Sequence, residues 1–245
     1  MGYQIASGAL APLLALQGRR VRRATPQLPE PPGPHSGTRG VGPPLRLLLV
    51  GDSAAAGVGA ASQDEALSGR LADELAPTFR VSWTLIARTG ATTAGTARHL
   101  ARRPAEECGA FDIAVLSLGG NDVMGRRPLD RWLADVGEVA ALLRVRFSVR
   151  HILLSGLPPM HVFPGLPQPL RWYLGATARK FDRALAGWAT TQPDCEHVPL
   201  ELTDGAGLLA TDGPHPGPAL YHRWGVELAR RIRARWASVP PVEPL

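Results

Sequence analysis

The chain has 245 residues, of which 44% are hydrophobic and 20% are charged, and its formal net charge is +6. This composition is close to the average of globular proteins and excludes a chain that is disordered throughout. No apolar run reaches the roughly 18 residues that a membrane-spanning helix needs. The length is typical of one large α/β domain or of two small domains.

The positive charge is concentrated near the N-terminus. Residues 1–46 hold six arginines and one glutamate, whereas the rest of the chain holds 21 basic and 20 acidic residues. The nearly neutral remainder shows no interleaving of basic and aromatic residues, so we expect no nucleic-acid partner. The two cysteines, Cys108 and Cys195, have neither metal-ligand spacing nor a CxxC arrangement, and we expect no metal site from them.

The first apolar stretch, residues 5–16, is followed by four arginines between residues 19 and 23. A secretory signal has the reverse order, with its basic residues before the apolar stretch. The observed order favours a downstream chain that stays in the cytoplasm. We therefore predict a cytoplasmic protein, and one interpretation of residues 5–23 is peripheral contact with the inner face of the membrane. The alternative is an N-terminus that is frayed or packed locally.

Residues 26–44 contain seven prolines and almost no large apolar side chains. Such a segment buries too little surface to offset the entropy lost on ordering, and it is typical of a linker. We therefore predict three parts of the chain. They are an apolar and basic segment with its Pro-rich linker over residues 1–44, a folded domain over residues 45–238 and a C-terminal tail over residues 239–245.

Short apolar runs alternate with amphipathic stretches along the predicted domain. Strands are expected at residues 45–50, 81–87, 111–118, 151–155 and 196–199, and helices at residues 65–75, 93–102, 129–147, 170–188 and 218–236. Continuously apolar runs such as LRLLLV at residues 45–50 are typical of strands that are buried on both faces. The alternation predicts an α/β fold, with a parallel sheet covered by helices on both faces.

Small and polar residues follow three of the predicted strands. The segments are Gly51-Asp52-Ser53 after the first strand, Arg88-Thr89-Gly90 after the second and Gly119-Gly120-Asn121-Asp122 after the third. A fourth polar group, Asp212-Gly213-Pro214-His215, precedes the last predicted helix. Because ligands bind outside the carboxyl ends of the strands in open α/β sheets, we expect these segments to converge there.

These residue types suit acyl transfer. Serine needs a base within hydrogen-bond reach, and His215 can accept the Ser53 proton while Asp212 orients the imidazole and stabilises its cation. The oxyanion that develops needs preorganised N–H donors, for which the candidates are the backbone of Ser53 and Gly90 and the side chain of Asn121. Each motif alone is more readily explained by a turn or a helix cap, and their order along the chain is what favours a catalytic set.

The ordered set resembles the SGNH (GDSL-type) hydrolases, a family of serine esterases and lipases whose four namesake residues are matched by Ser53, Gly90, Asn121 and His215. The resemblance implies a three-layer α/β/α, flavodoxin-like fold with a parallel five-stranded sheet in the order 2-1-3-4-5. It implies no metal and no organic cofactor. It also implies hydrolysis of small-molecule acyl esters through an acyl-enzyme on Ser53.

The apolar segment after the fourth predicted strand supplies Met160, Phe163 and Leu166 as candidate contacts for an acyl chain. The alternative is a proline-stiffened loop that covers the sheet edge. Asp52 is expected to support the turn at Ser53 rather than to act as an acid or base. Acyl transfer and carbohydrate O-deacetylation stay open because the same catalytic group serves them, and so does a non-catalytic, membrane-associated binding protein.

Overall fold

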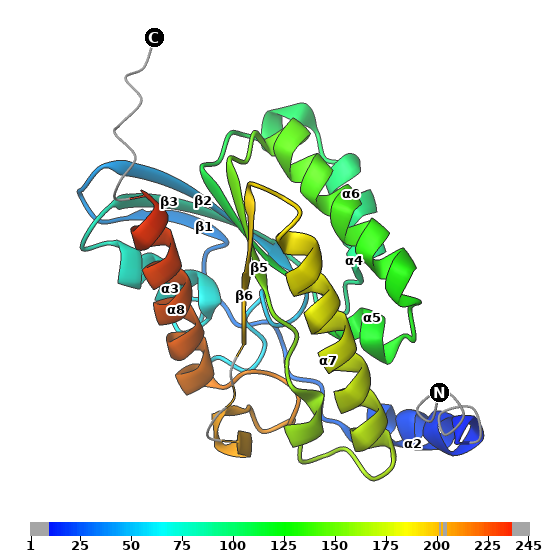
Figure 1. Ribbon diagram of the computed structural model, residues 1–245. Coiled ribbons are helices and arrows are strands. Elements are labelled where there is room, and N and C mark those ends of the chain that lie inside the picture. The colour runs from blue at the N-terminus through cyan, green and yellow to red at the C-terminus, as the bar shows by residue number, and fades with distance from the viewer. Residues whose placement is uncertain (1–9, 201, 203–204, 237–245) are drawn as a thin grey trace.

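The apolar strands form one sheet in the computed structural model, which describes residues 10–200, 202 and 205–236 (Figure 1). Within that part of the chain the sheet has six strands in the order β1-β3-β2-β4-β5-β6. Their bounds are Ser36–Arg39 (β1), Pro44–Gly51 (β2), Arg80–Ala87 (β3), Ile113–Ser117 (β4), His151–Ser155 (β5) and Cys195–Val198 (β6). Strands β2 to β6 pair in parallel, whereas β1 pairs antiparallel with β3.

The predicted α/β sheet is confirmed, with one added strand. The five predicted strands correspond to β2 to β6, and their spatial order β3-β2-β4-β5-β6 is the expected 2-1-3-4-5. Strand β2 occupies an interior position, where Leu47, Leu48 and Leu49 are 0% exposed, which explains its continuous apolar run. The sixth strand, β1, comes from the segment that we predicted to be a linker.

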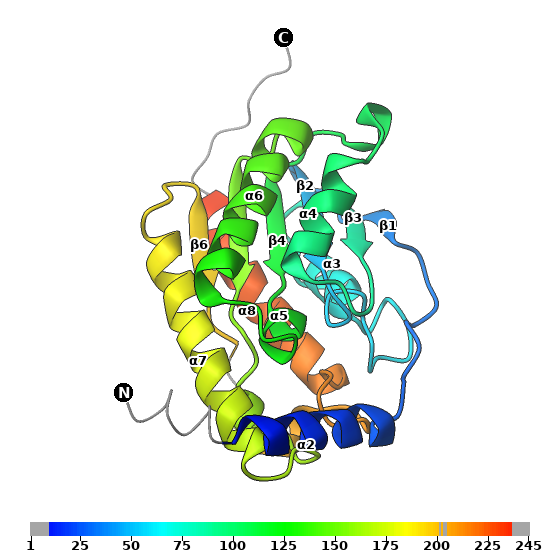
Figure 2. The ribbon, with the colours of Figure 1, turned by 90° about the vertical axis from the view of Figure 1, so that its right-hand side faces the viewer.

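The helices form two layers that enclose the sheet (Figures 1 and 2). Their bounds are Ala11–Ala24 (α2), Leu67–Leu75 (α3), Thr93–Ala101 (α4), Gly120–Met124 (α5), Leu129–Phe147 (α6), Leu170–Ala189 (α7) and Pro218–Trp236 (α8), with short 3-10 turns at Ala105–Glu107 (η1), Met160–Val162 (η2) and Gly205–Leu208 (η3). Helices α3 and α8 share one apolar cluster with Leu47 and Leu49, while α4, α6 and α7 share the other with Leu48 and Val50. This split follows the alternation of side chains along a strand.

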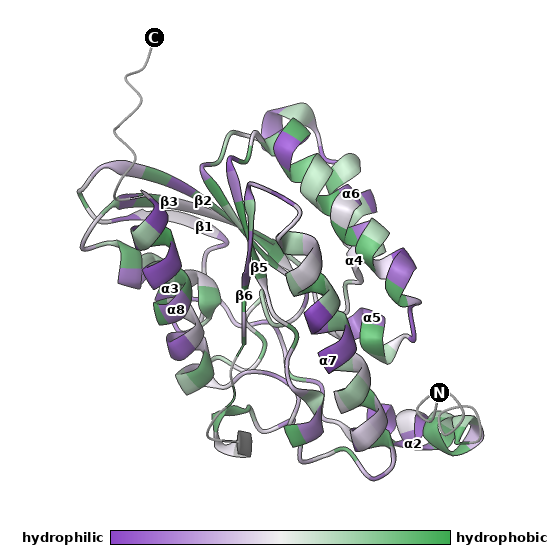
Figure 3. Ribbon diagram, viewed as in Figure 1, coloured by the Kyte–Doolittle hydropathy of each residue, from purple (hydrophilic) through white to green (hydrophobic). Residues whose placement is uncertain are grey.

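Helix α6 shows why the amphipathic stretches fold as predicted. Trp132, Val136, Leu143 and Phe147 recur at helical spacing on one face, and all four are at most 2% exposed. The ring of Trp132 lies 4.7 Å from the ring of Phe181 on α7, which joins neighbouring helices of this layer. Figure 3 shows that the helices carry both apolar and hydrophilic residues, as expected of elements with one side on the sheet.

The expected linker is wrong for part of residues 26–44. Residues 36–39 form β1, which covers the hydrogen-bonding edge of β3 that would otherwise be open. The backbone oxygen of Pro32 accepts a hydrogen bond from the Gln63 N–H at 2.9 Å, and the side chain of Gln63 reaches the oxygen of Pro31. A proline-rich segment cannot build its own core, but here an existing domain supplies its hydrogen-bond partners.

The preceding segment folds as helix α2, whose Leu14 is 2% exposed. This agrees with the local-packing alternative for residues 10–23, while residues 5–9 and the predicted tail over residues 239–245 lie outside the described residues. The described helices include none that combines the length and the apolar character needed to cross a bilayer. The boundaries of the predicted domain stay a prediction.

Candidate active site

Ser53 lies on the loop that follows β2, at the carboxyl edge of the sheet. A Cβ at Gly51 would lie 2.5 Å from the backbone oxygen of Ser117, so only glycine fits between the two strands at that point. Asp52 then donates its backbone N–H to the Ser117 oxygen at 3.1 Å, and its carboxylate accepts the Ala54 N–H at 3.1 Å. These two bonds shape the turn that presents Ser53.

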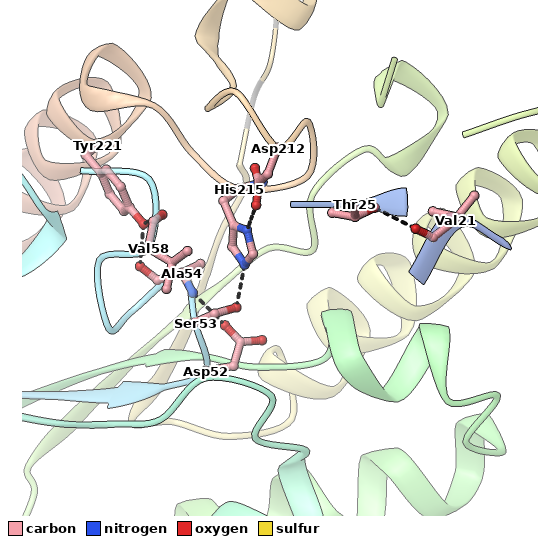
Figure 4. Close-up of polar contacts among 9 residues, drawn as sticks. All are labelled: Val21, Thr25, Asp52, Ser53, Ala54, Val58, Asp212, His215 and Tyr221. Carbon is pink, nitrogen blue, oxygen red and sulfur yellow. Dashed lines mark hydrogen bonds and ion pairs between the residues drawn. The ribbon is translucent and has the colours of Figure 1, made fainter. Parts of the chain in front are cut away.

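Figure 4 shows Ser53, His215 and Asp212 in a row, joined by hydrogen bonds. The hydroxyl oxygen of Ser53 lies 2.8 Å from Nε2 of His215. On the other side of the ring, Nδ1 of His215 bonds a carboxylate oxygen of Asp212, and the other oxygen accepts the His215 N–H at 3.3 Å. The Asp212 side chain is 1% exposed and that of His215 is 23% exposed. The structure therefore brings these three predicted residues together.

This row of groups can move a proton from an alcohol to an imidazole. Nε2 faces the hydroxyl as an acceptor when Nδ1 carries the proton, and the bond from Nδ1 to Asp212 fixes that tautomer. The buried carboxylate also stabilises the cation that forms when His215 gains a second proton. Such an arrangement activates a serine for attack on a carbonyl carbon.

The hydroxyl of Tyr221, on the first turns of α8, bonds the backbone oxygens of Ala54 at 3.0 Å and Val58 at 2.8 Å (Figure 4). Tyr221 is fully buried, and burial raises the pKa of its phenol well above the ordinary value. It therefore stays a neutral donor that fixes the loop after Ser53. No motif in the sequence marks Tyr221, because its partners are backbone atoms distant in the sequence.

The side chain of Asn121 lies between the loops that follow β2 and β3. Its amide nitrogen donates to the Ala91 oxygen at 2.9 Å and to the Asp52 carboxylate at 3.4 Å. Gly90, after β3, borders the cavity onto which Ser53 opens. It is exposed, and its φ of +77° lies in the left-handed region that favours glycine. The three residues predicted to supply oxyanion donors, Ser53, Gly90 and Asn121, therefore border one cavity.

Asp52 and Asp122 are buried carboxylates beside Asn121. Burial raises the pKa of Asp52 to about 6, although the hydrogen bond from the Ala54 N–H opposes the shift. The hydrogen bond that Asp52 accepts from the Ala54 N–H agrees with the predicted role of Asp52 in supporting the turn at Ser53. Burial likewise raises the pKa of Asp122, which accepts bonds from the N–H and the hydroxyl of Thr93 at 3.0 and 2.8 Å. Asp122 thus joins α5 to α4.

The Ser53 hydroxyl opens onto a cavity of about 510 Å³. The predicted contacts Met160, Phe163 and Leu166 line this cavity and are 2%, 6% and 9% exposed. A further part of the lining was not predicted: residues 21, 22 and 25–28 also border the cavity. Among the described residues, no group of three or more His, Cys, Asp or Glu side chains is placed to hold a metal ion.

The chain belongs to the GDSL-like lipase/acylhydrolase family, whose model matches residues 49–223. This confirms the resemblance inferred from the ordered motifs. A curated relative, the GDSL-like esterase Rv1075c of Mycobacterium tuberculosis, is 28% identical over 185 residues. That match covers 65% of this chain and 54% of the relative, so the chain spans about half of that protein's length.

Solved structures share the fold. A lipolytic protein of the G-D-S-L family from Veillonella parvula has a TM-score of 0.60 at 14% identity, over 79% of this chain and 99% of that one. Est24, a carbohydrate acetylesterase from Sinorhizobium meliloti, has a TM-score of 0.57 at 16% identity, over 78% of this chain and 99% of that one. At these identities the likeness establishes a common fold and no more.

Proposed function

We propose that the protein hydrolyses carboxylic esters of small molecules, with Ser53 as the nucleophile. The observation that carries the proposal is the 2.8 Å contact between the Ser53 hydroxyl and His215, whose other ring nitrogen bonds the buried Asp212. Membership of a lipase and acylhydrolase family supports the same reaction. An apolar cavity beside the hydroxyl supplies room for the acyl group.

In the acylation half of the proposed reaction, the Ser53 oxygen attacks the ester carbonyl carbon while its proton passes to Nε2 of His215. The carbonyl π electrons move to oxygen and form a tetrahedral intermediate with a negative oxygen. Collapse of that intermediate breaks the bond to the alcohol, which leaves with the proton from Nε2. The product of this half is an ester between Ser53 and the acyl group.

In the second half, a water molecule attacks the acyl-enzyme, and Nε2 of His215 accepts its proton. The tetrahedral intermediate collapses, the Ser53 oxygen recovers the proton from His215, and the carboxylic acid leaves. Only a neutral imidazole can accept a proton in either half, so the rate should fall as the medium becomes acidic.

We assign stabilisation of the oxyanion to the N–H groups of Ser53 and Gly90 and to the side-chain amide of Asn121. Both hydrogen bonds of the Asn121 amide go to protein oxygens, at 2.9 Å to Ala91 and 3.4 Å to Asp52. The longer bond, to Asp52, is the one that an oxyanion would replace. Asp52 and Ala91 therefore hold the amide in place before the substrate arrives.

The direct test is the variant Ser53→Ala. We expect its kcat for p-nitrophenyl esters to fall by at least about 1,000-fold, because the nucleophile is removed. A fluorophosphonate probe should label the wild-type protein at Ser53 and leave the variant unlabelled. Ser82→Ala on β3, whose hydroxyl bonds Thr38 instead, is the matched control and should keep activity and labelling. Activity that survives in the Ser53 variant would refute the nucleophile assignment.

The same proposed group serves acyl transfer or carbohydrate O-deacetylation, which differ in acceptor and leaving group. A scan over acyl esters, thioesters and acetylated sugars, each with water or an added alcohol as acceptor, separates these reactions.

The cytoplasmic location and peripheral membrane contact stay predictions. Exposed Leu13 and Leu16 on α2, 42% and 65% accessible, support the latter, and pelleting of the Leu13→Ser/Leu16→Ser variant with anionic liposomes tests it.

A further inference from the structure

Helix α2 is held against the rim of the active site by hydrogen bonds to the start of α7. The side chain of Gln17 donates to the Gln168 oxygen at 2.8 Å and accepts the Leu170 N–H at 3.2 Å. Leu14 belongs to the same apolar cluster as Met160 and is 2% exposed. Figure 2 shows α2 lying across the same end of the molecule as the start of α7.

The chain leaves α2 beside the cavity. Both the N–H and the hydroxyl of Thr25 bond the Val21 oxygen, at 2.8 and 2.9 Å, and the backbone at Thr25 turns from helical to extended. Val21, Thr25 and Leu28 border the cavity that contains Ser53. In Figure 4, Val21 and Thr25 lie on one side of Ser53, and Tyr221 lies on the other.

The far end of this segment is fixed as well. The Glu30 carboxylate accepts the N–H of Thr89 at 2.8 Å and its hydroxyl at 2.6 Å, next to Gly90. Beyond it, the Pro32 oxygen accepts the N–H of Gln63. Residues 21–30 are therefore anchored on both sides of the cavity, and they form a fixed wall rather than a free tail.

The cavity is suited to an alkyl chain. Val21 and Leu28 face a space that is also lined by Met160, Phe163 and Leu166, and its volume of about 510 Å³ lies in the range of small-molecule sites. An acetyl group has one methyl to place against these walls, whereas a longer acyl chain removes more apolar surface from water. Each methylene that the cavity admits should raise kcat/KM by roughly fourfold.

We propose that residues 21–28 form one wall of the acyl pocket, and that this wall selects esters of fatty acids longer than acetate and limits their length. The proposal deepens the proposed hydrolase function and rests on it. The residues concerned lie outside the range 49–223 that the family model matches.

The test compares kcat/KM for p-nitrophenyl acetate, butanoate, octanoate and dodecanoate. In the wild type we expect the value to rise beyond acetate and to fall once the chain exceeds the pocket. Val21→Trp fills the space at the wall and should lower the ratio of octanoate to acetate by about tenfold. Val21→Ala enlarges the space and should raise the ratio of dodecanoate to octanoate. Val145→Trp, on the exposed face of α6 and 82% accessible, is the matched control and should leave both ratios unchanged.

Equal chain-length profiles in wild type and Val21→Trp, with unchanged thermal unfolding, would overturn the proposal, as would an equal loss for every ester. If Val21→Trp does not fold, Val21→Ala provides the test. An unchanged ratio of kcat/KM for dodecanoate to that for octanoate in Val21→Ala would then overturn the wall proposal. Activity in Ser53→Ala would instead refute the proposed function. If the chain-length ratios do not change but Ser53→Ala is inactive, the wall proposal is wrong and the proposed hydrolase function is retained.

Discussion

The two sides of the cavity are built in different ways. On one side, Ser53, Asp212 and His215 lie on tight turns next to regular elements, and hydrogen bonds to backbone atoms hold those turns. On the other side, residues 21–28 belong to a helix and a proline-rich stretch that are fixed by contacts with distant parts of the chain. The first side carries the proposed chemistry, which tolerates little displacement, and the second shapes the space for the substrate.

Substitutions on the Ser53 side of the cavity are expected to lower kcat the most. Asp212→Asn keeps the shape of the side chain but no longer holds His215 in the tautomer that accepts the Ser53 proton. We expect a loss of roughly 10,000-fold in kcat. Labelling by the fluorophosphonate should slow with it, since both need an activated hydroxyl. Wild-type labelling in an inactive variant would contradict this role for Asp212.

A smaller loss is expected from Asn121→Ala. Removing one oxyanion donor should lower kcat by about 100- to 1,000-fold, with KM nearly unchanged, because the donor acts on charge that develops in the transition state. Steady-state kinetics on p-nitrophenyl butanoate measures both values, and thermal unfolding checks the fold. A variant that raises KM and keeps kcat would place Asn121 in substrate binding instead.

On the same side of the cavity, Asp52→Asn is expected to change how the free energy of unfolding depends on pH. Burial raises the pKa of Asp52 from 3.8 to about 6, so the folded state holds this proton more tightly than the unfolded state. The wild-type free energy of unfolding should therefore fall as the pH rises through that window, and the asparagine variant should lack this loss. Across the window, the difference between the two free energies of unfolding should change by about 3 kcal/mol in favour of the variant. Urea unfolding over a pH series measures it, and a constant difference would contradict the shift.

The smallest effect is expected on the other side, from Glu30→Gln. The amide oxygen still reaches Thr89 but accepts its bonds without a charge, and the site is exposed, so kcat should fall by only about two- to fivefold. The loss should be larger for octanoate than for acetate esters, as for Val21→Trp but weaker, because Glu30 anchors one end of the wall over residues 21–28. An equal loss for both esters would show that the Glu30 bonds act on the loop at Gly90 and not on the acyl wall.

The contrast between the two sides matches what the sequence could predict. The apolar run of β2 and the Gly-Asp-Ser turn after it are local patterns, and so is the Asp-Gly-Pro-His turn before α8. Each turn contains a local hydrogen bond, from the Ala54 N–H to Asp52 and from the His215 N–H to Asp212, so its residues could be predicted from the sequence. The family resemblance then ordered them around one site.

The unpredicted parts depend on tertiary contacts. Strand β1 forms only because β3 offers an open edge, and composition alone indicated a linker there. The Thr93 hydroxyl donates to the Asp122 carboxylate, and the Trp132 indole N–H donates to that hydroxyl at 3.0 Å. These bonds join helices whose relative placement no spacing rule gives. Val21 as part of the cavity could be found only once α2 had been positioned.

The bonds of Tyr221 have a consequence for the order of events during synthesis. The loop carrying Ser53 emerges from the ribosome early, but Tyr221, which fixes it, belongs to α8. His215 also comes late, immediately before that helix. A nascent chain therefore carries an idle hydroxyl until α8 has been translated and docked, and ester cleavage should begin only then.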